Sequence, residues 1–207
     1  MRQHLFLFMA LLFASEALAQ KEPPAPEVPF ALPAPEGWRT ETFTLPPEFA
    51  PKLPYRGLEE LRFAPGMFKP GSEDFWSYAF IFWLEGEVPV TAEQLNADLK
   101  TYFEGLSRAV EEKNAKFDPK AATVTAHLTE AKASQEGQKR FEGKVDTYDP
   151  FKTHKPLTIN VRVHVSRCAA QGKTVALFQA SPQPGTHKVW EQLERIREGF
   201  RCSKAGN

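Results

Sequence analysis

The chain has 207 residues, and its 26 basic side chains balance its 26 acidic ones, so the formal net charge is zero. A neutral chain without a block of basic residues argues against nucleic acid and anionic membrane surfaces as partners. Once an N-terminal leader and a proline-rich stretch are set aside, about 165 residues remain, which suits one domain with a substantial hydrophobic core.

The first residues have the pattern of a cleaved secretory signal. Arg2 supplies a positive start, residues 5–13 form an unbroken apolar run, and Ala17-Leu18-Ala19 provides the small residues of a cleavage site. A membrane-spanning helix needs about 20 apolar residues, so this run is too short for an anchor. We therefore predict a signal peptide over residues 1–19 and export to the periplasm or the cell exterior. No cysteine stands near the end of the signal, so no lipid anchor is expected.

A proline-rich head is expected after the signal, with six prolines between residues 21 and 35. Because proline fixes φ and lacks a backbone donor, we predict an extended, disordered head over residues 20–36. A proline-rich recognition segment is the alternative for the same residues. A single α+β domain is expected over residues 37–203, followed by a short tail at residues 204–207.

The first part of the domain is expected to supply three strands, at residues 40–45, 58–64 and 75–84. The third is apolar on both of its alternating faces and rich in aromatic residues, which suits a strand. A strand of this kind is usually covered on both sides, so we place it near the centre of a sheet. An exposed aromatic binding face is the alternative interpretation.

A long helix and four more strands are expected next. Thr91 to Gln94 fits a capping box, in which the threonine hydroxyl and the glutamine side chain exchange hydrogen bonds with backbone donors of the first turn. Apolar residues recur at helical spacing from Leu95 to Val110, and the helix should end before Pro119. The remaining pattern predicts four strands and a terminal amphipathic helix, at residues 122–129, 138–148, 157–167, 174–180 and 187–201.

Cys168 and Cys202 are the two cysteines of the chain. An even pair in an exported protein favours a disulfide, which would tie the terminal helix to the strand at residues 157–167. Two buried free thiols, or a thiol nucleophile, are the alternatives, although no C-x-x-C spacing supports redox catalysis.

These elements predict an α+β fold, with one twisted, mainly antiparallel sheet of about seven strands and two helices, mid-chain and C-terminal, packed on it. The element order, the export signal and the stripe of Trp190, Ile196 and Phe200 after the last strand resemble the PsbP-like fold, seen in the photosystem extrinsic protein PsbP and the periplasmic protein DcrB. The resemblance implies a fold for residues 37–202, and it transfers no functional residue.

One candidate contact site lies on the strand at residues 157–167. Asn160, Arg162 and His164 share one of its faces, while the other face is apolar. Arg162 can bind a carboxylate or phosphate with its planar guanidinium, and His164 can change charge near neutral pH. A solvated sheet face without a ligand is the alternative.

Two loops carry the other candidates. Met67 and Phe68 stand in a loop bounded by proline and glycine, where they can form a ligand lid or a partner contact, or simply pack into the core. The segment Tyr148-Asp149-Pro150-Phe151 is a third loop candidate of the same kind.

The sequence contains none of the common catalytic or nucleotide-binding motifs, and no two histidines have the spacing of a metal site on one strand or helix. We therefore expect no metal and no cofactor, and a non-catalytic exported domain that binds an envelope protein or a small molecule. The alternative is a hydrolase or transferase that uses His164 or a loop carboxylate as general base. A structural role in envelope assembly is the third interpretation.

Overall fold

The computed structural model describes residues 27–112, 114, 117–120, 122–133 and 137–202, so the predicted signal peptide lies outside the described residues. Within them the chain forms seven strands, two α-helices and one 3₁₀ helix: β1 (Arg39–Leu45), β2 (Gly57–Phe63), β3 (Tyr78–Glu85), α1 (Ala92–Glu111), β4 (Thr125–Ala131), β5 (Lys139–Tyr148), β6 (Pro156–Cys168), η1 (Ala169–Gln171), β7 (Lys173–Ser181) and α2 (Val189–Gly199). Neither described α-helix is long and apolar enough to cross a membrane.

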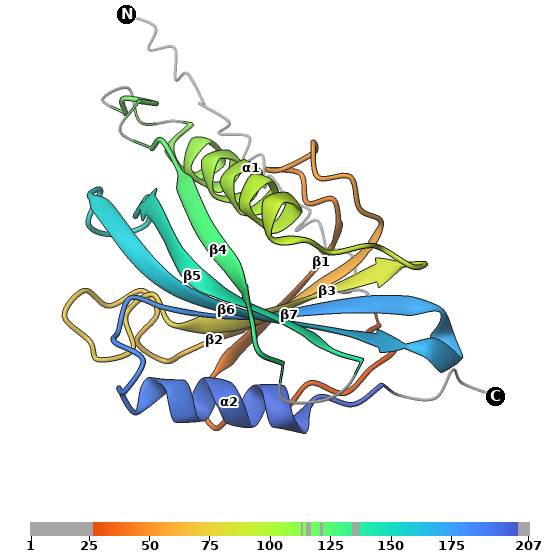
Figure 1. Cartoon of the computed structure of the whole chain (residues 1–207). Coiled ribbons are helices and arrows are strands. Elements are labelled where there is room, and N and C mark those ends of the chain that lie inside the picture. Colours follow the sequence, from red (N-terminus) through yellow and green to blue (C-terminus); the bar gives the residue numbers. More distant parts are fainter. Residues whose placement is uncertain (1–26, 113, 115–116, 121, 134–136, 203–207) are drawn as a thin grey trace, which may run out of the picture.

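The strands form one sheet in the order β1-β2-β3-β7-β6-β5-β4, and every neighbouring pair is antiparallel. With α1 on one side of this sheet and α2 on the other, the predicted α+β architecture is confirmed (Figure 1). β3 lies inside the sheet between β2 and β7, and both of its faces are buried. Phe80 belongs to the core beneath α1, whereas Ile81 belongs to the core beneath α2. The sheet therefore separates two hydrophobic cores.

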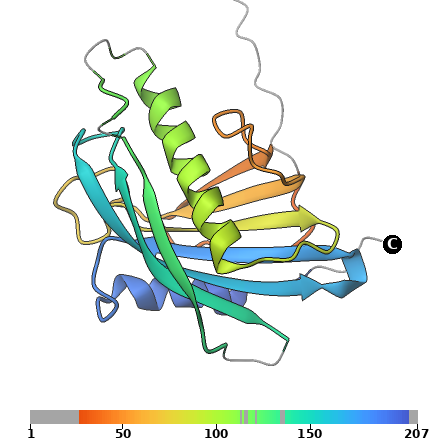
Figure 2. The same ribbon diagram turned by 45° about the horizontal axis from the view of Figure 1, so that its top comes forward.

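α1 lies obliquely across one face and packs mainly against β4 and β5 (Figure 2). Thr91 caps the helix, since its hydroxyl oxygen accepts a hydrogen bond from the backbone N–H of Gln94 at 3.2 Å. The Gln94 side chain donates to Asp98 instead of reaching back to the cap, so only half of the predicted capping box forms. The helix ends at Glu111, ahead of Pro119 as expected.

The segment between β1 and β2 covers part of the sheet that α1 leaves free. Leu53 and Tyr55 from this segment are buried in the core beneath α1. Its backbone approaches the helix closely, because a Cβ atom on Gly105 of α1 would stand 2.1 Å from the carbonyl oxygen of Phe49. Only glycine allows this approach, so Gly105 fixes how near the loop can lie to α1.

β3 begins at Tyr78, three residues later than the start predicted at residue 75. Trp76 has a φ of 53°, a left-handed conformation that interrupts an extended strand. The Trp76 side chain is nevertheless buried in the same core as Phe80.

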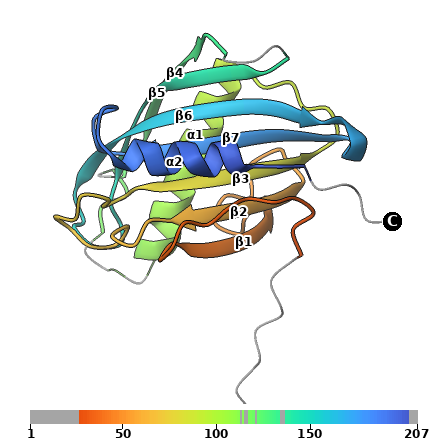
Figure 3. The same cartoon turned by 90° about the horizontal axis from the view of Figure 1, so that it is seen from below.

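α2 lies over the middle of the opposite face, beside β3 and β7, with β4 and β5 to one side of it (Figure 3). Its buried residues form the amphipathic stripe that the sequence indicates: Val189, Trp190, Leu193 and Ile196.

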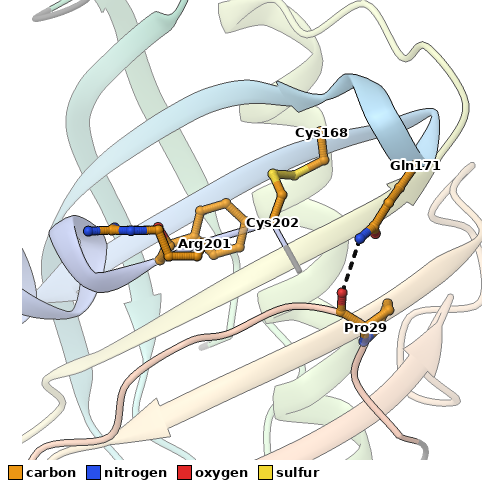
Figure 4. Close-up of a disulfide and its surroundings, with 6 residues drawn as sticks. Pro29, Cys168, Gln171, Arg201 and Cys202 are labelled. Atoms are coloured by element: carbon orange, nitrogen blue, oxygen red, sulfur yellow. Dashed lines mark hydrogen bonds between the residues drawn. A yellow bond between two sulfur atoms is a disulfide. The ribbon is translucent and has the colours of Figure 1, made fainter. Parts of the chain in front are cut away.

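A disulfide joins Cys168, at the end of β6, to Cys202, just beyond α2 (Figure 4). It confirms the predicted pairing and links the C-terminal end of α2 to the sheet. Close to the disulfide, the Gln171 side chain donates a hydrogen bond to the carbonyl oxygen of Pro29 at 3.3 Å.

The prediction of a disordered head over residues 20–36 is wrong for residues 27–36, which pack against the domain. Phe30 and Leu32 are buried in the core beneath α2, and Ala31 forms a two-way backbone bridge with Arg201. The apolar residues between the prolines supply enough buried surface to hold this segment against the domain. The described part of the domain therefore begins before residue 37.

Candidate functional site

Arg162 lies on the sheet face beside α2, where the alternation of β6 places it. Its guanidinium carbon is 4.2 Å from the ring centre of Trp190, and no described residue gives the guanidinium a hydrogen-bond acceptor or an ion pair. Together with Lys144 it borders a shallow hollow of about 280 Å³. Asn160 borders the same hollow, but its amide already donates to the carbonyl oxygen of Gln183 at 3.0 Å. Contact between Arg162 and an anionic group is chemically possible, and it stays a prediction.

His164 is held by the protein itself. Its Nε2 lies 3.3 Å from the side-chain oxygen of Gln179, on the neighbouring strand β7. Burial, followed by the positive charge of Arg197, lowers the pKa of His164 to about 4. The imidazole is therefore neutral and weakly basic at pH 7, which does not fit the expected change of charge near neutral pH.

An aromatic cavity of about 230 Å³ lies on the opposite face, between α1 and the β1–β2 edge of the sheet. It is located where loops cover the strands together with Tyr102 and Leu106 of α1. Aromatic rings from strands, helix and loops form most of its wall, among them Phe49, Phe63, Trp76, Tyr78, Tyr102 and Phe151. A concave site with mainly apolar walls and few polar groups is the usual form of a small-molecule pocket.

Two of the loop candidates from the sequence meet at this cavity. Met67 and Phe68 both line it, and so does Phe151 from the loop after β5. Met67 is buried, whereas Phe68 is only partly buried. The Phe68 ring centre lies 5.2 Å from that of Phe151 and 5.8 Å from that of Phe63. Phe68 thus forms an outer wall of the cavity, where aromatic pairs of this spacing stabilise the loop.

We call Arg39, Glu41 and Phe68 the rim of the cavity, since Glu41 and Phe68 line it and the exposed Arg39 lies over the Phe68 ring. The Arg39 guanidinium carbon lies 5.0 Å from the ring centre of Phe68 and 5.7 Å from that of Phe63, within the range of a cation–π interaction. The same guanidinium is 3.6 Å from a carboxylate oxygen of Glu41, a residue that lines the cavity. The rim therefore combines aromatic faces, a cation and a carboxylate.

A buried carboxyl group lies behind the cavity wall. Glu59 of β2 is fully buried, and the Tyr102 hydroxyl donates to its Oε1 at 2.7 Å. Its Oε2 has no hydrogen-bond partner in the described part of the chain. Burial raises the pKa of Glu59 to about 8, the Tyr102 hydrogen bond opposes this rise, and the charge of Glu41 adds to it. The carboxyl is mostly protonated at pH 7, and Tyr102 connects it to the cavity.

The sequence did carry a signal for Glu59 that the prediction of contact sites missed. Two adjacent glutamates stand between Leu58 and Leu61 in a predicted strand, so one of them must point toward each face of the sheet. Glu60 points to the α2 side and pairs with Arg62, which leaves Glu59 on the α1 side. Both faces of an inner strand are covered, so a buried carboxyl was predictable from the pattern.

No group of three His, Cys, Asp or Glu side chains in the described ranges is arranged to hold a metal ion. The residues that line the cavity are instead mainly aromatic, two of them tyrosines, together with the apolar side chains of Leu61, Met67 and Leu106 and the Glu41 carboxylate. No protein-family model and no curated protein matches the chain, so the PsbP-like resemblance stays a prediction and function has to be argued from these side chains.

Proposed function

We propose that this protein is an exported, non-catalytic binding domain that holds a small, mainly apolar ligand in the aromatic cavity beside α1. The observation that carries the proposal is the cavity of about 230 Å³, whose wall is built from aromatic residues of strands, helix and loops. Such a wall offers a ligand a large apolar area and ring faces for stacking.

Export is supported by the disulfide between Cys168 and Cys202, because such bonds persist in oxidising compartments outside the cytosol. It is also supported by the predicted signal peptide. Mass spectrometry of the protein secreted with its own leader tests this part of the proposal. The expected product begins at Gln20 and is two hydrogens lighter than the reduced chain.

His164 gives the alternative of a hydrolase little support. The described residues place no nucleophile in hydrogen-bond contact with its imidazole, and its pKa of about 4 makes it a poor base at neutral pH.

Binding is tested with N-phenyl-1-naphthylamine, an uncharged probe whose fluorescence rises in apolar surroundings. The wild-type protein is expected to bind it saturably with one site per chain. Leu106 lines the cavity and is only partly buried, so Leu106→Trp should fill part of the space and weaken binding at least tenfold. Val110→Trp is the matched control, because Val110 is an exposed residue one turn further along α1.

Both variants should keep the wild-type far-ultraviolet circular dichroism. Equal probe affinity in the two tryptophan variants, or unsaturable binding to the wild type, would show that the cavity is not the binding site.

A further inference from the structure

We infer that the natural ligand of the aromatic cavity carries a fixed positive charge, as an aromatic or alkyl quaternary ammonium compound does, and that this charge is held between the rim rings and the Glu41 carboxylate. The inference rests on the proposed function, because it names the ligand class for the same cavity.

The side chain of Arg39 already occupies the place of such a charge. Its guanidinium lies over the rings of Phe68 and Phe63 and beside the carboxylate of Glu41. Ring faces attract cations through their quadrupole, and quaternary ammonium groups are commonly recognised by aromatic residues. Arg39 is well exposed, with 59% of its side chain accessible, so a ligand cation can displace it into solvent. The protein thus shows with its own residue which charge the rim accepts.

The polar side chains that line the cavity are acidic, which is opposite to the positive charge of Arg39. Glu41 is the one ionisable carboxyl group among the described residues that line it, and the other oxygen-bearing side chains there are the phenols of Tyr78 and Tyr102. Behind them lies the Glu59 carboxyl, one oxygen of which has no hydrogen-bond partner among the described residues. A ligand carboxylate in this cavity would be repelled by Glu41, whereas a cation would be attracted by it, and also by Glu59 once that carboxyl ionises.

Glu59 gives the inference a second, pH-dependent consequence. The groups that face its carboxyl are Tyr102 from α1, Tyr78 from β3 and Glu41 from β1, and all of these are acids. Burial raises the pKa of Glu59 to about 8, so the carboxyl gains its negative charge as the pH rises above neutrality. A quaternary ammonium ligand does not titrate, so tighter binding at high pH reports ionisation of the protein.

The first test compares three ligands of similar shape by isothermal titration calorimetry and ligand-observed NMR. Benzyltrimethylammonium carries the charge, neopentylbenzene is its uncharged isostere, and phenylmethanesulfonate carries a negative charge. We expect the cation to bind about fivefold more tightly than the isostere, and the anion to bind more weakly than both. The preference for the cation should increase between pH 6.5 and 9, and Glu59→Gln should abolish this increase.

The second test uses rim variants. Arg39→Ala removes the competing internal cation, so the affinity for benzyltrimethylammonium should rise about threefold. Glu41→Gln should lower that affinity and leave the binding of neopentylbenzene unchanged. Glu130→Gln is the control, because Glu130 is an exposed carboxylate on β4, at the opposite edge of the sheet.

The outcomes separate the two proposals. If neither benzyltrimethylammonium nor neopentylbenzene binds, the proposed function itself fails. If the isostere binds as tightly as the cation, apolar binding stands and the inference of a cationic ligand is wrong. If the anion binds best and Arg39→Ala weakens it, Arg39 is the partner of an acidic ligand and the inference is overturned.

Discussion

Replacing Glu59 by Gln should remove a strong pH dependence from the stability of this protein. The pKa of Glu59 is raised from an ordinary value of 4.5 to about 8, chiefly by burial, so the native state keeps a proton that the unfolded chain releases. The stability that this proton contributes is complete below pH 4.5, falls as the pH rises, and is lost above about pH 8. Within this window, between pH 4.5 and about 8, each pH unit lowers the free energy of unfolding by about 1.4 kcal/mol.

A measurable part of this window lies between pH 6.5 and 8. His164 has the opposite effect, because its pKa is lowered from 6.5 to about 4, and that effect is confined below pH 6.5. We therefore expect the wild type to lose about 2 kcal/mol relative to Glu59→Gln between pH 6.5 and 8. Burial also raises the pKa of Asp98, but this effect is the same in the wild type and in Glu59→Gln, so it cancels in the difference between them.

The assay is urea unfolding followed by tryptophan fluorescence at pH 5, 6.5, 8 and 9, with the disulfide intact in every sample. Gln keeps the shape of the Glu59 side chain, so the fold should be preserved. Glu130→Gln serves again as the exposed control, with a profile parallel to that of the wild type. Parallel profiles for wild type and Glu59→Gln would show that Glu59 is already ionised at neutral pH, and the account of the buried carboxyl would be wrong.

Three further predictions concern the disulfide and the α2 side of the sheet. Replacing Cys168 and Cys202 by Ala removes a disulfide that joins residues 34 positions apart in sequence. This should lower the free energy of unfolding in urea by about 3–4 kcal/mol, and an unchanged urea midpoint would contradict it. NMR titration of His164 should show its imidazole protonating near pH 4. The stability that the neutral imidazole contributes should be complete above pH 6.5 and lost as the pH falls through 4, and His164→Gln should not show this loss. Leu193→Ala in α2, at a fully buried position, should cost about 2–5 kcal/mol in thermal or urea unfolding, and a cost below 1 kcal/mol would mean that α2 is loosely packed.

Much of the fold was predictable because strand alternation and helical spacing each identify a buried face. β6 alternates Ile159, Val161 and Val163 with polar residues, and its apolar side is buried as expected, in the core that lies beneath α1. The two-sided apolar pattern around Phe80 correctly indicated an inner strand. These features depend on local periodicity, which one sequence contains in full.

The candidate site was predictable only in part, because a cavity depends on how distant loops meet. Sequence reasoning selected Met67, Phe68 and Phe151 from two separate loops as contact residues, and all three line the cavity. It could not place them beside each other, nor beside Arg39 of β1, since no local pattern encodes that proximity. It also treated His164 as exposed enough to titrate near neutral pH, because the strand pattern does not show that Gln179 and α2-side residues surround it.

The different covers on the two faces of the sheet explain why the cavity forms on one side. Beneath α2, the helix, the segment with Phe30 and Leu32, and the disulfide to Cys202 close over β3 and β7. On the other face α1 packs mainly on β4 and β5, and loops cover the β1–β2 edge. The cavity lies on this second face, where loop residues such as Phe49, Phe68 and Phe151 contribute to its wall. Under the proposed function, substitutions at Phe68 or Arg39 would change ligand preference without disturbing the sheet, which is the behaviour expected of a binding site placed on a rigid scaffold.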